Sequence, residues 1–325
     1  MRQHHQDGVL LAVAPSAAQW DEVCAAAPGA TFFHRYEFLR SVAPPLRCRF
    51  VPLLVLHQGR PAGAAPLLIK QLGPFSSINW VPFPYLGPLV PEPLVPATLR
   101  ALQAEARRRR AVNHQQSFCR VIGGPHADGF AARTDRTFVV QLSGRSDEDL
   151  LGAMHNGHRW QIRRARRAGF SVQPAQPGDF QLMDAWLDQM FRSRGQRNGY
   201  PAGAAQRVFE GLGTSSRSFT QAARIGGRTV AVQLTLADGE RALGWQIAVD
   251  PEFRAERPHA LLVWRALQQA RDMGIAEFDM VGAPNDGIAA YKARFGARER
   301  CYTVLHQQAA LHRAAHSTAR RLRWG

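Results

Sequence analysis

The sequence has little cysteine and no long apolar run. Its four cysteines, at positions 24, 48, 119 and 301, lie far apart, form no CxxC pair and have no histidine at zinc-site spacing. Scattered cysteines in a chain of this length are typical of a reducing cytoplasm. No stretch reaches the roughly 18 apolar residues that a membrane-spanning helix needs. These absences predict a cytoplasmic protein that has no membrane span.

Several catalytic motifs are missing as well. The chain has no GxSxG elbow, no Walker loop, no HExxH and no glycine-rich dinucleotide fingerprint, which disfavours hydrolases, P-loop enzymes and dehydrogenases. His155 and His158 lie one helical turn apart, but no carboxylate or cysteine completes a metal site around them. We therefore expect no metal and no tightly bound cofactor.

Acidic residues are scarce. There are 25 Asp and Glu against 41 Lys and Arg, which gives a formal net charge of +16. Most of the basic residues are arginine, which binds phosphates through a planar fork and stays charged. The surplus favours tRNA, nucleotide diphosphates or an anionic membrane face as partners. An arginine-rich proteome would give the same surplus, so charge leaves the choice open. A peripheral position at the inner membrane face is the alternative to a free cytoplasmic one.

A chain of 325 residues of which 45% are apolar has the size of two domains. In the second half, an antiparallel meander is followed by a helix, a strand, a helix and a strand. The ranges are Phe219–Ile225, Thr229–Leu236, Ala242–Val249, Pro258 to about Met273, Glu277–Val281, Ile288–Arg294 and Cys301–Leu305. This order resembles the core of the GNAT acetyltransferase fold.

The first half repeats the order more weakly. Its expected elements are strand Val9–Val13, hairpin Phe50–Leu56 with Ala62–Ile69, helix Pro96–Arg108, and strands Phe118–Ile122 and Thr137–Leu142. Residues 74–96 are rich in proline and predict an extended loop. The segment 147–168 predicts one helix, or two if its glycines break it. The fold class is α/β (α+β), with two tandem GNAT-like domains, 1–145 and 146–325. Each has a mixed, mostly antiparallel sheet flanked by helices. The second begins and ends with a basic helix.

Several segments together resemble the FemABX family, over about residues 30 to 300. They are Thr31-Phe32-Phe33-His34, Tyr85-Leu86-Gly87-Pro88, Trp160-Gln161-Ile162-Arg163-Arg164, Arg197-Asn198-Gly199-Tyr200, Phe278-Asp279-Met280-Val281-Gly282 and Tyr291-Lys292-Ala293-Arg294-Phe295-Gly296. The resemblance implies an acyltransferase that forms an amide bond, with aminoacyl-tRNA as donor and an amine of a peptidoglycan or other cell-envelope precursor as acceptor. The coiled-coil arm of some family members is absent.

Three residues near the end of the match are the catalytic candidates. Lys292, beside Tyr291, follows the last central strand, where GNAT folds place their reaction centre, and the resemblance implies that it stabilises the oxyanion or the leaving oxygen. Asp279 is the carboxylate of the central strand. It either accepts the proton of the amine or caps the turn before Gly282.

The binding candidates lie elsewhere in the chain. The resemblance implies that Arg197 binds a diphosphate or carboxylate of the acceptor and that Arg40 is a basic substrate contact. Tyr85 and Trp80 of the aromatic loop are further substrate contacts. A cluster of arginines on one helix suits an RNA or phosphate backbone, or else forms a solvated face. Its members are Arg159, Arg163, Arg164, Arg166 and Arg167.

The turn before the central helix of the second half bears on the donor. GNAT enzymes bind the CoA pyrophosphate on N–H groups of a glycine-rich turn. Here Arg254–Ala260 contains no glycine, Pro258 has no N–H, and Glu256 is acidic. Weak binding of acetyl-CoA is expected. An acyl-CoA or acyl-carrier-protein thioester donor remains the alternative, and a non-catalytic nucleic-acid-binding protein is the third reading.

Overall fold

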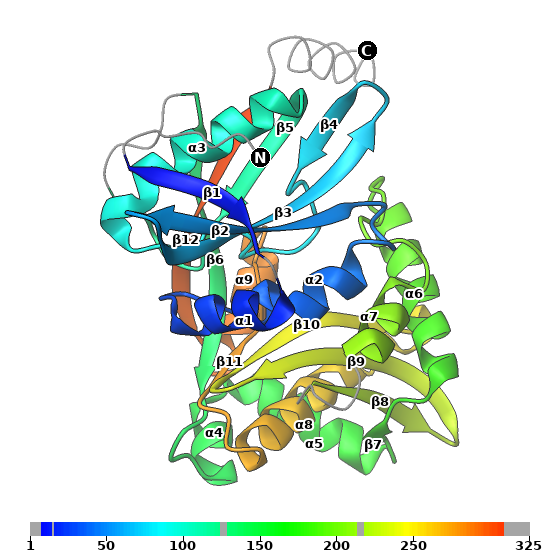
Figure 1. Cartoon of the computed structure of the whole chain (residues 1–325). Coiled ribbons are helices and arrows are strands. Elements are labelled where there is room, and N and C mark those ends of the chain that lie inside the picture. The colour runs from blue at the N-terminus through cyan, green and yellow to red at the C-terminus, as the bar shows by residue number, and fades with distance from the viewer. Residues whose placement is uncertain (1–7, 15, 124–128, 213–217, 309–325) are drawn as a thin grey trace. The chain divides into compact units, whose positions relative to one another are not determined.

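The computed structural model describes residues 8–14, 16–123, 129–212 and 218–308 of the chain (Figure 1). The chain divides into two compact units. The first comprises residues 1–134 and 302–325, and the second comprises residues 135–301. The expected class is confirmed, because each unit has a mixed, mostly antiparallel sheet with helices packed against it. The sequence-based division into domains 1–145 and 146–325 stays a prediction.

The first unit is built on six strands in the order β1-β2-β3-β4-β5-β12. All neighbours pair antiparallel except β4 and β5, which are parallel. Its elements are β1 (Val9–Val13), α1 (Ala17–Ala26), η1 (Phe32–His34), α2 (Tyr36–Val42), β2 (Arg49–His57), β3 (Arg60–Leu72), β4 (Phe75–Ile78), η2 (Glu92–Leu94), α3 (Val95–Arg108), β5 (Ala111–Ser117) and most of β12 (Arg298–Gln308).

The second unit repeats this pattern of directions in the order β7-β8-β9-β10-β11-β6. Here β10 and β11 are the parallel pair. Its elements are most of β6 (Ala131–Gln141), α4 (Asp147–Ala153), α5 (Asn156–Arg167), β7 (Ser171–Pro174), α6 (Pro177–Arg192), α7 (Ala204–Leu212), β8 (Phe219–Ile225), β9 (Arg228–Asp238), β10 (Arg241–Val249), η4 (Pro251–Phe253), α8 (Pro258–Asp272), β11 (Glu277–Asp279) and α9 (Asp286–Ala293).

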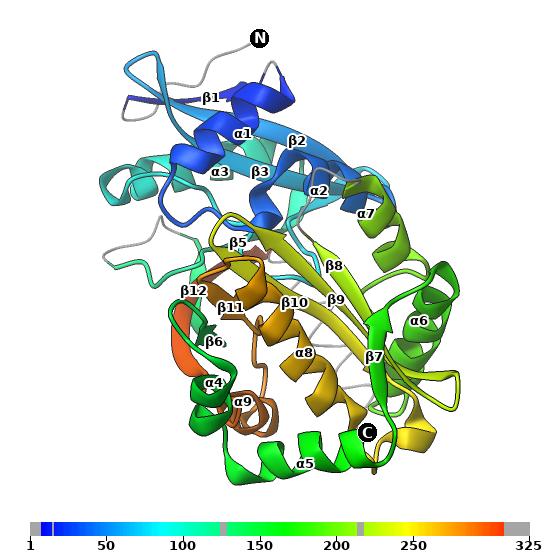
Figure 2. The ribbon, with the colours of Figure 1, turned by 90° about the horizontal axis from the view of Figure 1, so that it is seen from below.

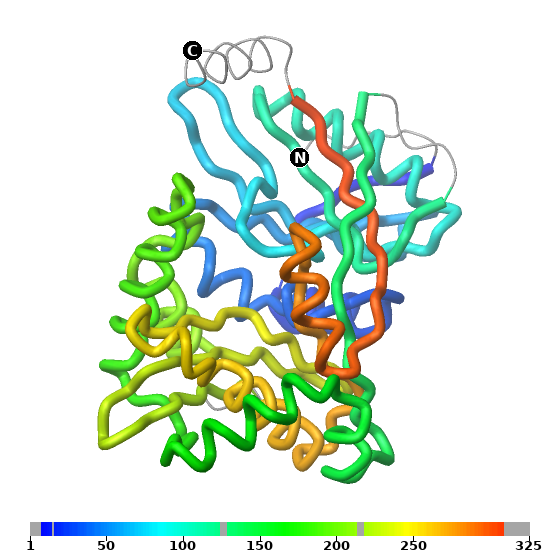
Figure 3. Tube along the Cα trace, turned by 180° about the vertical axis from the view of Figure 1, so that it is seen from behind, coloured from blue at the N-terminus to red at the C-terminus, as the bar shows by residue number. Residues whose placement is uncertain are grey.

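The last strand of each half belongs to the sheet of the other. β6 follows β5 in the chain but pairs with β11, from Gln141 opposite Glu277 to Val139 opposite Asp279. β12 ends the second half but pairs with β5, from Val304 opposite Ser117 to Gln308 opposite Asn113 (Figure 3). The two halves of the sequence therefore exchange their final strands.

Hairpin turns and helix faces follow from the sequence. The turn between β2 and β3 has positive φ at Gln58 (51°) and Gly59 (76°), as a two-residue hairpin loop requires. The apolar stripe of α3, with Leu99, Leu102 and Ala106, is at most 4% exposed and faces the core of the first unit. The predicted strand Val9–Val13 is confirmed residue for residue.

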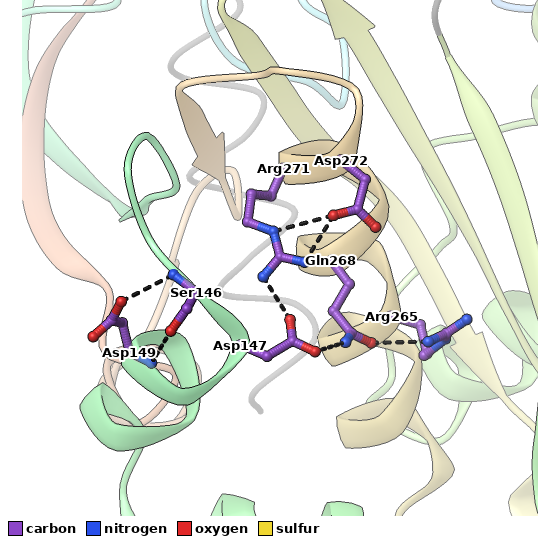
Figure 4. A network of polar contacts seen from close by, with 7 residues as sticks. All are labelled: Ser146, Asp147, Asp149, Arg265, Gln268, Arg271 and Asp272. Atoms are coloured by element: carbon purple, nitrogen blue, oxygen red, sulfur yellow. Dashed lines mark hydrogen bonds and ion pairs between the residues drawn. The ribbon is translucent and has the colours of Figure 1, made fainter.

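The segment 147–168, expected to form one helix or two, forms two, and both dock on α8. α4 begins with a capping box in which Ser146 and Asp149 bond each other's backbone N–H groups. Asp147 accepts from Arg271 and Gln268 of α8, both at 2.5 Å (Figure 4). α5 then packs along α8 (Figure 2), and α8 packs against β8, β9 and β10. These contacts seat the basic helix on the second unit.

Three expectations differ from the structure or fall outside it, and two helices were missed. Residues 118–122 are not a strand, because β5 ends at Ser117. The proline-rich segment contains the short strand β4, which the prolines concealed. α6 and α7 were not predicted. The predicted C-terminal basic helix lies in residues 309–325, outside the described residues.

Candidate functional site

The parallel strands β10 and β11 separate at one end of their pairing. They pair only from Arg241 opposite Glu277 to Leu243 opposite Asp279, and β10 then continues to Val249 while β11 stops. Beyond the last pair, β10 has a bulge in its register with β9. Ligands of sheets with parallel strands bind outside the carboxyl ends, where neighbouring connections diverge. This opening is the candidate site of the second unit.

The segment 280–282 leaves β11 at the opening in a constrained conformation. Val281 has a φ of 56°, which is costly for a β-branched residue. Its N–H donates to the carboxylate of Asp279 at 2.7 Å. Asp279 is 3% exposed and also accepts from the hydroxyl of Thr137. Of the two roles left open for Asp279, these contacts favour the turn cap.

Lys292, on α9, completes the restraint of this segment. Its ammonium donates to the carbonyls of Met280 at 2.5 Å and Gly282 at 2.7 Å, and also to that of Val281. An ammonium has three N–H donors, so these carbonyls use all of them. A substrate oxygen can therefore reach the ammonium only by displacing one of the three carbonyls.

Burial lowers the pKa of Lys292 to about 8, while the nearby charge of Asp279 acts in the opposite direction. Loss of water disfavours the charged form of the lysine. The three carbonyls replace the hydrogen bonds that water would otherwise make to the ammonium. The ammonium is present below about pH 8 and is lost as the pH rises through that value. When it is charged, Lys292 binds the three carbonyls, and it can lose its proton at a mildly alkaline pH.

Tyr291, the neighbour of Lys292, packs elsewhere. Its ring lies 5.0 Å from that of His158 on α5 and 5.2 Å from that of His259 on α8, measured between centroids. Its hydroxyl oxygen is buried, and no described residue forms a hydrogen bond with it. Burial raises the pKa of the hydroxyl. The same burial lowers the pKa of both histidines to about 4, so both are neutral at pH 7.

The N-terminus of α8 lies beside this cluster. Its N-cap is Arg257, which is in the left-handed region with a φ of 53°, and no side chain caps the helix there. Pro258 follows at the first helical position and offers no N–H. Backbone donors are therefore fewer here than a glycine turn would provide. The predicted weakness of CoA binding stays a prediction, with this geometry as its basis.

Arg197 is exposed on a loop that α6 anchors. The side chain of Asn198 donates to Asp188 at 2.8 Å, and the N–H of Gly203 donates to Asp184. Two carboxylates of one helix thus hold the loop at both ends. A flexible arginine on a held loop can bind an anionic ligand without a large loss of backbone entropy.

The same loop contacts the bulge of β10 through Tyr200. The indole N–H of Trp245 donates to the hydroxyl of Tyr200 at 3.0 Å, and the two rings meet edge to face at 5.5 Å. Burial raises the pKa of this hydroxyl, whereas hydrogen bonds to Trp245 and Gln246 oppose the rise. Tyr200, Trp245 and Gln246 therefore link the Arg197 loop to the opening. Sequence reasoning did not single out this contact, although Tyr200 ends one of the family-like motifs.

The other predicted contacts belong to the first unit. Arg40 is exposed in the last turn of α2. Trp80 is 50% exposed after β4. Tyr85 is only 1% exposed, and its ring packs between Phe33 at 6.1 Å and Tyr302 at 5.0 Å. Tyr85 therefore has the surroundings of a core residue, whereas Trp80 and Arg40 have the exposure that ligand contact requires.

The five arginines of α5 lie on the side of the helix away from its buried residues. His158, Gln161, Ile162 and Ala165 face the core, while four of the arginines are exposed and Arg159 is half-buried. Arg164 lies over the ring of exposed Trp160, 5.2 Å from its centroid. Within the described part of the chain, no carboxylate forms an ion pair with any of the five. This α5 arginine face therefore keeps its charge uncompensated.

Metal clusters and membrane-spanning helices are both absent from the described residues. No three His, Cys, Asp or Glu side chains gather there in a way that could hold a metal ion. No described helix is both long and apolar enough to cross a membrane.

Part of the second unit is similar to a known family. Residues 156–293 match the family described as an acetyltransferase (GNAT) domain. This stretch contains α5, the Arg197 loop, the β10–β11 opening and Lys292. No curated protein has a significantly similar sequence. The match confirms the acyltransferase class expected from the sequence.

Solved structures extend the similarity to nearly the whole chain. FemX is 12% identical, with a TM-score of 0.67 over 93% of this chain and 97% of its own. The C-terminal domain of a putative lysylphosphatidylglycerol synthetase from Agrobacterium fabrum is 14% identical, with a TM-score of 0.58 over 94% and 98%. A tandem GNAT protein from the clavulanic acid biosynthesis pathway is 16% identical, with a TM-score of 0.57 over 92% and 98%. The resemblance to FemABX-type folds is confirmed.

Proposed function

We propose that this chain, an acyltransferase with a GNAT domain in a FemX-like fold, moves an aminoacyl group from aminoacyl-tRNA to an amine of a cell-envelope precursor. The amine nitrogen attacks the ester carbonyl, an amide bond forms, and the bond to the ribose oxygen breaks. The amine proton leaves to water or to the released ribose oxygen. The product is an amide, and the tRNA is deacylated.

The observation that carries the choice of donor is the α5 arginine face. Five guanidinium groups on one helix, with no described carboxylate partner, form a surface that a phosphate backbone can neutralise. An acyl-CoA donor would instead need N–H groups for its pyrophosphate at the start of α8. Arg257 and Pro258 leave few there. Both features favour RNA over CoA.

The proposed role of Lys292 in this reaction is to stabilise the oxyanion. The tetrahedral intermediate carries an oxyanion, which needs a donor at about 3 Å. In the β10–β11 opening, an oxyanion that displaces one of the three carbonyls would receive a charged hydrogen bond from Lys292. The remaining two carbonyls and the nearby charge of Asp279 would keep the ammonium in place.

Arg197 is proposed to bind a diphosphate or carboxylate of the acceptor. Its loop is attached to the bulge of β10 through Tyr200 and Trp245. Binding energy gained at Arg197 can therefore align the acceptor amine with the opening, and such alignment accounts for a large share of catalysis in bimolecular reactions.

A thioester-dependent N-acyltransferase is the second candidate, because residues 156–293 match the acetyltransferase family. The two readings differ in the donor and share the opening, Lys292 and the amide product. A third reading, a nucleic-acid-binding protein without activity, predicts RNA binding and no transfer from any donor.

The test reverses charge on the α5 arginine face. Arg159, Arg163 and Arg167 are changed to Glu, and binding of total tRNA is measured against salt. We expect the triple variant to lose retention on a phosphate resin. Its salt slope should fall by about 0.7 to 0.9 for each phosphate that the protein no longer neutralises. Transfer of label from aminoacyl-tRNA to an amine should fall in parallel.

A matched control changes three exposed arginines outside α5, namely Arg49, Arg60 and Arg298, to Glu. This control has the same net charge as the test variant. A difference in tRNA binding between the two variants therefore depends on where the charges lie and not on their number. Equal tRNA binding by the two variants, or none by the wild type, would remove the RNA donor and favour the thioester.

A further inference from the structure

The tip of the β3–β4 hairpin exposes two large apolar side chains. β3 and β4 join at Gly73 and Pro74, at the top right of Figure 1. Leu72 lies opposite Phe75 in the register, so the two side chains share one face of the hairpin. They are 40% and 48% exposed. Exposed apolar pairs on a projecting turn are unfavourable in water unless something covers them.

The turn holds this pair in place. Gly73 has a φ of 61°, which suits the first central position of a tight two-residue hairpin turn. The side-chain amide of Gln71 donates to the carbonyl of Gly73 at 2.7 Å. Leu72 and Phe75 are therefore presented by a regular hairpin with a fixed turn geometry.

A run of arginines borders the tip end of the same hairpin. Ser76 of β4 donates through its N–H to the carbonyl of Arg110 at 3.2 Å, and through its hydroxyl to that of Arg109 at 2.9 Å. These bonds fix the end of α3 beside β4. Glu105 forms ion pairs with Arg108 and Arg109.

Three cations at this edge keep their charge uncompensated. Lys70 lies opposite Ser77 in the hairpin, and Arg107 and Arg110 flank the end of α3. All three are exposed, and none forms an ion pair with a carboxylate of the described segments. Lys70 lies on the same face of the hairpin as Leu72 and Phe75, and the two arginines lie at the end of α3 that Ser76 holds beside the tip. We call these five residues the hairpin edge: Lys70, Leu72, Phe75, Arg107 and Arg110.

We propose that the hairpin edge docks on the surface of an anionic phospholipid bilayer. Leu72 and Phe75 would enter the boundary between headgroups and acyl chains, while the three cations meet lipid phosphates. This pairing of apolar and basic groups is what interfacial binding requires. Docking would also bring the protein to the surface that holds lipid-linked substrates, and in that respect the inference rests on the proposed function and deepens it.

Charge decides against two other occupants. The last 17 residues of the chain, 309–325, contain four arginines and no acidic residue, so the hairpin edge would repel them. A second copy carries a net charge of +16 and is repelled in the same way. RNA is anionic as well, and Phe75 offers one ring for stacking, but the side chain of Leu72 beside it would stay exposed in an RNA complex, whereas a bilayer buries both.

The experiment is co-sedimentation of the full chain with vesicles of phosphatidylcholine alone or mixed with phosphatidylglycerol. We expect binding to the mixed vesicles that weakens as salt rises. Changing Lys70, Arg107 and Arg110 to Glu should weaken it at least about 100-fold, since each cation near an anionic surface contributes about fivefold. The double change Leu72→Ser and Phe75→Ser should weaken it at least about tenfold.

The control exchanges two exposed valines elsewhere in the first unit, Val13→Ser and Val121→Ser, which are 57% and 54% exposed. It should bind as the wild type does, and thermal unfolding checks that every variant folds. Equal binding to both vesicle types, wild-type binding by the hairpin variants, or loss only when the α5 arginine face is reversed would each overturn the proposal. If the hairpin variants lose tRNA binding while no variant binds vesicles, the occupant is RNA. Aminoacyl transfer to a water-soluble amine is measured separately, so failure of docking and failure of the proposed reaction are distinguishable.

Discussion

Replacing Lys292 by methionine should affect both stability and turnover. Methionine has a similar length but no donor, so the carbonyls of Met280, Val281 and Gly282 lose their partner. An acceptor left unpaired costs about 1 to 3 kcal/mol, and the lower figure applies where water can enter, so we expect about 3 kcal/mol in total. For a unit of this size, that lowers the melting temperature by about 6 to 12 °C.

Turnover of the Lys292→Met variant should fall at least about 10²-fold, which is the usual effect of losing one group that stabilises an oxyanion. Because burial lowers the pKa of Lys292 to about 8, the ammonium is lost as the pH rises through about 8. Wild-type turnover should decline there, and the residual turnover of the variant should not.

Thermal unfolding and an assay of amide product at pH 6.5 to 9 measure these effects. Arg298→Met, which removes an exposed cation nearby in the sequence, is the control. A variant with unchanged turnover would remove Lys292 from the mechanism. A variant with lower turnover but unchanged stability would refute the view that Lys292 also holds segment 280–282.

Three further measurements follow from other parts of the molecule. Calorimetry should find that acetyl-CoA binds with a dissociation constant of about 1 mM or weaker, worth about 4 kcal/mol, because Pro258 and Arg257 leave few free N–H groups; micromolar binding would favour the thioester donor. Burial lowers the pKa of His34 to about 4, so its contribution to stability is complete above pH 6.5 and is lost as the pH falls through 4. The melting temperature should drop over that window less steeply in His34→Gln, and equal slopes would contradict this. Asp147→Ala should lower the free energy of unfolding by about 1 kcal/mol, since it removes a partly exposed ion pair with Arg271 and a hydrogen bond; a chemical denaturation curve identical to that of the wild type would exclude that contribution.

The second half of the fold was readable from the sequence because its signals are local. Strands β8 to β10 alternate or run apolar between turn residues, and α8 begins at a proline and ends before Gly274. Short β4 was hidden because prolines surround it on both sides. The strand expected at 118–122 was misplaced because the polar run of β5, 111–117, forms the buried strand instead.

The candidate site was predicted only in part, for a physical reason. Motifs placed Asp279 in the central strand and Lys292 after it, and the structure joins both to segment 280–282. The three-carbonyl contact of Lys292 could not be read from the sequence, because it depends on the positive φ of Val281. The link from Tyr200 to Trp245 spans 45 positions and depends on the bulge of β10.

The exchange of final strands has a consequence for synthesis of the chain. While the ribosome translates the protein, β5 emerges early, but its partner β12 is made only when residues 304–308 appear near the end. Until then the first unit has an open strand edge along Asn113–Ser117, which is the kind of edge that nascent chains use to associate wrongly. The first unit is therefore the last to be completed, although it begins the chain. The interval between the synthesis of β5 and that of β12 is therefore the stage at which this edge most needs chaperone protection.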